Sequence, residues 1–200
     1  MIDMEANANL SDAGIKNMKM KNRNGFTLVE LLTVVCVIAL MTAIAVPNIL
    51  SRLPDIRLRG VARDLYGNMQ NMRMVAVKLN RNTAVIFDTI NNKYEVCDNW
   101  DSTTSACAVV GKQTIDFSKM NNGIGYGHGN LATTAVPGGA FPDDEVSYNP
   151  PDNVVVFNSQ GLGTGGYVYL DHDGNTTTYA VGSQTSGVIK LLKWQGSAWE

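Results

Sequence analysis

The carboxylate of Glu30 lies inside an almost purely apolar run that extends from Phe26 to Val46. In a membrane-spanning helix an acid costs roughly 2.5 to 3.5 kcal/mol at the bilayer centre and less near an interface, so it normally marks a functional partner. The nearest basic side chain, Arg23, is seven residues away. Cleavage between Gly25 and Phe26 would place a new α-amino group four residues before Glu30, on the same helical face. That cation could neutralise the acid of its own helix or of a neighbouring copy.

The apolar run has 21 residues, which as a helix would be about 31 Å long and would match a bilayer core of roughly 30 Å. Lys16, Lys19, Lys21 and Arg23 precede the run and no Lys or Arg interrupts it. The positive-inside rule therefore predicts a cytoplasmic N-terminus and places everything after Val46 outside the cytoplasm.

An alternative is a secretory signal peptide cleaved after Ala45, within the small-residue sequence Ala-Ile-Ala. Two features oppose it. The run is longer than the roughly 7 to 15 residues of such an apolar region, and Glu30 falls inside it.

The sequence GFTLVELL, residues 25–32, resembles the processing signal of type IV prepilins, which pilins and type II secretion pseudopilins share. The resemblance implies that a prepilin peptidase cuts after Gly25 and methylates the amine of Phe26. It also implies that Glu30 registers the subunit against the Phe26 amine of its neighbour in a filament. Pro47 matches a position where the helix of this family commonly bends.

The first fifteen residues contain Asp3, Glu5 and Asp12, which fit a basic leader poorly. Translation from Met18 or Met20 would give a compact basic leader instead. Peptides from residues 1–15 in the uncleaved precursor would contradict this interpretation.

After Val46 the pattern predicts a continued, bent helix, because Pro47 and Pro54 each remove a backbone donor. One apolar face recurs at steps of three and four; it consists of Leu58, Ala62, Leu65, Met69, Met72, Ala76 and Leu79. The opposite face carries Arg57, Arg63, Arg73 and Lys78, and we interpret it as a solvated surface, with an anionic-lipid or nucleic-acid contact as the alternative.

From about residue 81 the period changes to two and turn residues multiply, which predicts short strands. The expected strands are 83–88, 93–97, 112–117, 154–157, 167–170, 177–181 and 188–194. One long helix followed only by strands predicts an α+β fold, with the helix packed on an antiparallel β-rich head. The expected organisation is a cleaved leader (1–25), a spanning segment (26–46), an amphipathic helix (47–80) and a head (81–200).

The segments VVVFNSQGLGTGGYVYL and SGVIKLLKW resemble the H-type minor pseudopilins and related minor pilins (GspH/FimT family). The basic residue that usually follows the Phe-x-x-x-Gly turn in this family is missing, because Leu162 follows Gly161. We therefore do not expect the cationic loop of that family here.

Cys97 and Cys107 would lie in the oxidising periplasm and are close in sequence, so we expect a disulfide. On the chain-entropy model it would contribute about 3 kcal/mol. Cys36 lies in the apolar run, where a lone cysteine acts as a small hydrophobe.

No cofactor, metal or catalytic site is expected. The sequence GIGYGHG, residues 123–129, lacks the phosphate-loop lysine and indicates a loop. Asp171 and Asp173 could ligate calcium, but Asp173 with Gly174 is the expected signal of a hairpin turn between two strands, which we favour. His128 and His172 are far apart in sequence, with no carboxylate or nucleophile at a suggestive spacing.

These observations predict a non-enzymatic subunit of a pseudopilus or type IV pilus, most consistent with type II secretion, delivered as a single-pass inner-membrane precursor. Its expected partners are the prepilin peptidase, other pilins or pseudopilins in a filament or tip complex, and inner-membrane lipid. A minor pilin that binds DNA for uptake is the alternative. Seven basic against two acidic residues in 52–81 support it, whereas twelve acids against five basic residues in 82–200 oppose it.

Overall fold

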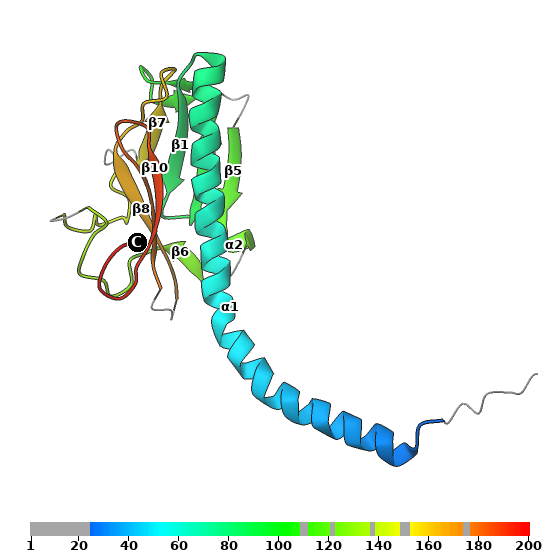
Figure 1. Cartoon of the computed structure of the whole chain (residues 1–200). Coiled ribbons are helices and arrows are strands. Elements are labelled where there is room, and N and C mark those ends of the chain that lie inside the picture. The colour runs from blue at the N-terminus through cyan, green and yellow to red at the C-terminus, as the bar shows by residue number, and fades with distance from the viewer. Residues whose placement is uncertain (1–24, 109–111, 121–122, 137–138, 149–152, 174–176) are drawn as a thin grey trace, which may run out of the picture. The chain divides into compact units, whose positions relative to one another are not determined.

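The computed structural model describes residues 25–108, 112–120, 123–136, 139–148, 153–173 and 177–200 (Figure 1). The predicted basic leader and the proposed start at Met18 or Met20 lie outside these residues. The chain divides into two compact units, Met1–Val46 and Pro47–Glu200. Each unit is described separately below.

One long helix, α1, begins at Leu28 and ends at Leu79, and it contains both Pro47 and Pro54. Its last turn closes in the Schellman pattern, in which a residue with positive φ reverses the chain. Asn80 has φ 48°, the N–H of Arg81 donates to the Ala76 carbonyl (3.2 Å), and the N–H of Asn80 donates to the Val77 carbonyl (3.4 Å). Asparagine tolerates this left-handed conformation better than most side chains, so the helix stops here and the first strand follows.

The head holds two antiparallel four-stranded sheets. The first has the order β5-β2-β1-β7, and its strands are β1 (Thr83–Asp88), β2 (Lys93–Cys97), β5 (Lys112–Asp116) and β7 (Val154–Phe157). The second has the order β10-β9-β8-β6, and its strands are β6 (Ile124–Tyr126), β8 (Gly166–His172), β9 (Tyr179–Ser183) and β10 (Ile189–Lys193). A short pair, β3 (Trp100–Asp101) with β4 (Ala106–Cys107), and a single-turn helix, α2 (Phe117–Met120), complete the described elements.

The main core lies where α1 packs on strands of both sheets (Figure 1). The helix contributes Leu58, Val61, Ala62, Leu65, Met69, Met72 and Ala76, all buried. The sheets contribute large side chains such as Tyr94, Phe157 and Leu170, each fully buried. The predicted α+β architecture, a long helix on an antiparallel β-rich head, is confirmed.

Two details of the predicted apolar face are wrong. Leu79 is 46% exposed, because the helix ends there and the chain turns away at Asn80. Val61 is buried although the predicted stripe omitted it.

The strands at 83–88, 93–97 and 154–157 have the predicted bounds. The segment 123–129, expected to be a loop, instead contains β6, which pairs with β8 through Ile124 and His172. Its glycines allow close approach: a Cβ at Gly127 would lie 2.2 Å from Asp171 Oδ1. Glycine here serves packing of the strand against its neighbour and does not mark a loop.

Candidate functional site

The start of α1 is built around Thr27 and Glu30. The N–H of Glu30 donates to Thr27 Oγ1 (3.2 Å), and the N–H of Leu31 donates to the Thr27 carbonyl (3.1 Å). Thr27 is therefore the N-cap, and Glu30 occupies the third helical position, which is the Thr-x-x-Glu spacing of a capping box. An acid in the first turn is also stabilised by the helix dipole.

The sequence interpretation assigned Glu30 only to an amine partner and missed this local role. The signal that could have revealed it is the threonine three residues before an acid at the head of an apolar run. Glu30 thus has a structural reason to stand in the first turn, and this reason is compatible with a charged partner.

Gly25 and Phe26 immediately precede the cap. No atom of the described chain lies within 4 Å of the place where a Cβ at Gly25 would be. The Phe26 side chain is 81% exposed. Neither residue packs against the described chain, so neither identity is explained by packing within it.

The first part of α1, from Leu28 to Val46, is apolar and exposed. Its most apolar 18-residue window has a mean hydropathy of 2.6, with none of it buried. Among the described residues, α1 is the helix long and apolar enough to cross a membrane. Large side chains such as Leu28 (80% exposed) and Ile44 (78%) are left uncovered by the residues that the structure describes.

Hydroxyl groups in this segment are satisfied within the helix itself. Thr33 Oγ1 donates to the Glu30 carbonyl (2.8 Å), and Thr42 Oγ1 donates to the Ile38 carbonyl (3.0 Å). These bonds matter because hydrocarbon offers no water to unpaired polar groups. The segment is suited to surroundings of lipid or of other apolar helices.

The two prolines with a predicted role occupy positions inside this same helix. Pro47 is the first residue of the second compact unit, and Pro54 lies one turn before the first buried residue, Leu58. The helix bend expected at these positions stays a prediction.

The predicted disulfide between Cys97 and Cys107 is present, with Cα atoms 5.9 Å apart. Cys97 is the last residue of β2, and Cys107 pairs with Trp100 across the β3-β4 ladder. The bond therefore fixes a small excursion at the end of the first sheet. Cys36 is a free, exposed cysteine in the apolar segment.

The head also contains a contact between a histidine and a carboxylate that sequence reasoning missed. His128 Nδ1 lies 2.6 Å from both carboxylate oxygens of Glu145, although the two residues are 17 positions apart. The His128 ring stacks on Phe141, with centroids 3.9 Å apart. Burial raises the pKa of Glu145, while the hydrogen bond from His128 opposes that shift.

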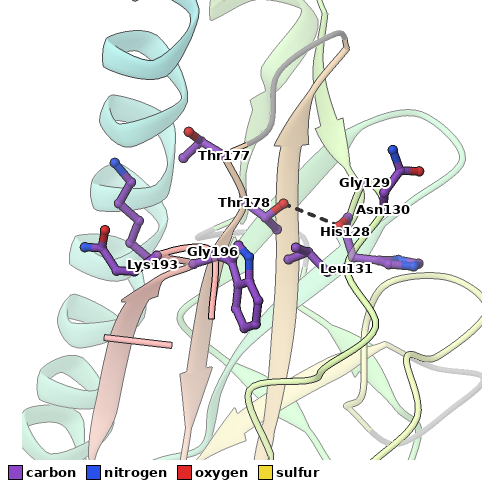
Figure 2. Close-up of a pocket in the computed structure, with 10 residues that line it drawn as sticks. His128, Gly129, Asn130, Leu131, Thr177, Thr178, Lys193 and Gly196 are labelled. Carbon is purple, nitrogen blue, oxygen red and sulfur yellow. Dashed lines mark hydrogen bonds between the residues drawn. The ribbon is translucent and has the colours of Figure 1, made fainter. Parts of the chain in front are cut away.

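A cavity of about 470 Å³ opens beside His128 (Figure 2). Thr178, which directly precedes β9, lines this cavity, and its Oγ1 donates a hydrogen bond to the His128 carbonyl (3.4 Å). Lys193 lines the same cavity. The His128 ring hydrogen-bonds to Glu145, so the imidazole links its loop to that carboxylate.

The calcium alternative concerned Asp171 and Asp173. Asp171 Oδ2 accepts a hydrogen bond from the N–H of Gly129 (3.1 Å), and burial raises the pKa of Asp171. The described residues contain no group of three or more side chains suited to hold a metal. Gly174, the other half of the predicted turn, lies outside the described residues.

Comparison with known proteins gives two matches along the chain. Residues 20–46 match the prokaryotic N-terminal methylation motif. Residues 61–187 match the family described as type II transport protein GspH. No curated protein matches the chain.

Solved structures similar to this chain include a minor pseudopilin and a type IV minor pilin. The minor pseudopilin EpsH from the Type 2 Secretion System of Vibrio cholerae is 12% identical, covers 68% of this chain and 96% of its own, and has a TM-score of 0.43. The type IV minor pilin FimU of Pseudomonas aeruginosa is 15% identical, covers 72% of this chain and 92% of its own, and has a TM-score of 0.47.

Proposed function

This chain belongs to the type II transport protein GspH family, and from that premise we propose that it is a minor pseudopilin that supports protein secretion through a periplasmic pseudopilus. Its general role is that of a structural subunit of the pseudopilin and minor pilin class. The finer assignment to type II secretion rests on the family match over residues 61–187.

The proposal rests on two matched segments that follow one another along the chain. The first is apolar and exposed, and the second folds around a buried core. The methylation motif, residues 20–46, covers a helix start whose apolar side chains are all exposed. The GspH match, residues 61–187, covers the part of the chain that buries its own core. Such a subunit has a head that buries its own core and an apolar helix that stays exposed. This is the form expected of a subunit that assembles through its helix.

In the proposed mechanism, a prepilin peptidase cuts after Gly25 and methylates the new amine of Phe26. The exposed position of both residues ahead of the Thr27 cap supports access by such an enzyme. The inner membrane then stores the subunit, with its N-terminus cytoplasmic and its head in the periplasm.

Assembly moves the apolar helix from lipid into a filament of pilin-like helices. Glu30 then meets the Phe26 amine of a neighbouring subunit, where an opposite charge within about 4 Å offsets part of the cost of burying the acid. In this mechanism the apolar side chains of the helix supply the contact surface between subunits, and Glu30 sets their register. The chain itself catalyses no reaction.

Mass analysis of the protein from its native membrane tests this proposal. The expected result is an intact chain that begins at Phe26 and carries one methyl group on its amine. A chain that begins at Val46 would instead make the protein a secreted domain and remove Glu30 from any mechanism.

A further inference from the structure

We propose that the first turns of α1 beyond Val46, residues 47–57, form a contact with the surface of an anionic lipid bilayer. The contact combines exposed aliphatic side chains, which enter the boundary of the acyl region, with two arginines that bind lipid phosphates. This inference rests on the membrane-stored stage of the proposed function.

The residues of this surface lie on one side of the helix. At about 100° per residue, Ile49, Arg52 and Ile56 fall close together, and Leu50 and Arg57 extend the same arc to roughly 160°. Ile49 is 60% exposed, Leu50 58% and Ile56 61%. The arc lies opposite the side on which Leu58 is buried. Leu53, near the middle of the arc, is half-buried, whereas the residues of the arc on either side of it are exposed.

The arginines of this arc carry uncompensated charge. Within the described residues, neither Arg52 nor Arg57 has a hydrogen bond or an ion pair. Asp55 is the acid between them, and its Oδ2 lies 3.7 Å from Lys193 Nζ on β10. The head thus engages the nearby carboxylate and leaves the two guanidinium groups free for an external anion.

The position along the chain favours lipid as that anion. Arg52 lies six residues after the spanning segment, which corresponds to at most about 9 Å of helix rise. Headgroup layers add several ångströms on each side of the hydrocarbon core, and an arginine stem can lie along apolar surface while its head reaches phosphate. The three exposed aliphatic side chains suit an acyl boundary and would gain little from nucleic-acid phosphates.

The test uses the soluble unit that starts at Pro47. Every buried hydrophobic residue of the described chain lies between Leu58 and Ile189, so this unit contains the whole core. Flotation with vesicles of phosphatidylglycerol and phosphatidylcholine should recover the protein, and pure phosphatidylcholine vesicles should recover far less. Binding should weaken as salt rises, because exposed charges are screened.

The double variant Arg52→Gln/Arg57→Gln should bind the anionic vesicles about 25-fold more weakly, at about fivefold for each arginine. The matched control is Lys78→Gln/Lys190→Gln, which removes two exposed cations outside the arc and should bind as the parent does. A second variant, Ile49→Ser/Ile56→Ser, should also lower vesicle binding while leaving the circular dichroism spectrum unchanged.

Absence of vesicle binding at low salt overturns the inference, as does an equal loss in the lysine control. Retention of duplex DNA through the same two arginines, without flotation, overturns it in favour of a nucleic-acid contact. The outcome is separable from the proposed function, because a native chain can begin at methylated Phe26 whether or not the soluble unit binds vesicles.

Discussion

Thr27 Oγ1 accepts a hydrogen bond of 3.2 Å from the backbone N–H of Glu30, so the acid of the apolar segment also belongs to the cap of its helix. Two roles therefore meet in one residue. The carboxylate can attract a cation from a neighbour, and the residue can support the helix start.

Glu30→Gln separates these two roles, because glutamine still completes a capping box but carries no charge. We expect the variant to be processed at Phe26 and to remain in the membrane, with filament incorporation reduced at least tenfold. Cross-linking of subunits in sheared or detergent-extracted filaments measures this loss. Glu30→Leu also removes the polar side chain of the capping box, while it keeps the backbone N–H that donates to Thr27 Oγ1. Normal incorporation of Glu30→Gln would show that assembly does not need the charge of Glu30.

The disulfide between Cys97 and Cys107 closes a short loop at the end of β2. The double variant Cys97→Ser/Cys107→Ser should lose about 3 kcal/mol of unfolding free energy on the chain-entropy model. Urea unfolding of the unit from Pro47 measures it. The parent protein with reductant should unfold as the double variant does without it, and an unchanged midpoint in both would show that the bond adds no stability.

Gly187 and Gly196 offer a matched pair, since both have positive φ, 80° and 90° respectively. A Cβ at Gly187 would lie 1.9 Å from the Gly161 carbonyl oxygen, whereas one at Gly196 meets nothing within 4 Å. Gly196→Ala should cost about 1 kcal/mol through backbone strain alone. Gly187→Ala should cost clearly more, because two backbone segments must also separate. Similar unfolding midpoints for the two variants would contradict the close approach.

Burial raises the pKa of Glu145 above its usual 4.5, although the contact with His128 opposes the shift. The folded head therefore binds this proton more tightly than the unfolded chain does. Its contribution to stability falls as pH rises from about 4.5 through the raised pKa of the folded state. Glu145→Gln removes this dependence, so the stability of the parent relative to the variant should decrease across that window.

Thermal unfolding at a series of pH values measures that difference. Asp143→Asn changes an exposed acid two residues away and should follow the parent at every pH. A stability advantage of the parent over Glu145→Gln that grows as pH rises would contradict the assignment.

Local patterns predicted much of the fold. The alternation at Thr83–Asp88 and Lys93–Cys97 predicted two strands, which the structure pairs as an antiparallel hairpin with Asp88 opposite Lys93. The disulfide was predictable because the two cysteines are only ten positions apart and the expected compartment is oxidising.

Contacts between distant segments could not be predicted in the same way. The contact between His128 and Glu145 joins two residues that are distant in sequence, and no local pattern predicts which distant residues meet. The strand at Ile124–Tyr126 was not predicted, because Gly125 and Gly127 are more typical of a loop. In the fold their missing side chains make room for Asn92 and Asp171.

The buried core of the described chain lies within the unit from Pro47, and this affects how much energy assembly requires. Among the described residues, buried packing begins at Leu58, within the unit from Pro47. In the proposed assembly, transfer from lipid to filament exchanges one apolar environment for another around a single helix. The energy needed to extract a subunit is then set by the side chains of that helix, and the head can travel without any step of unfolding or refolding.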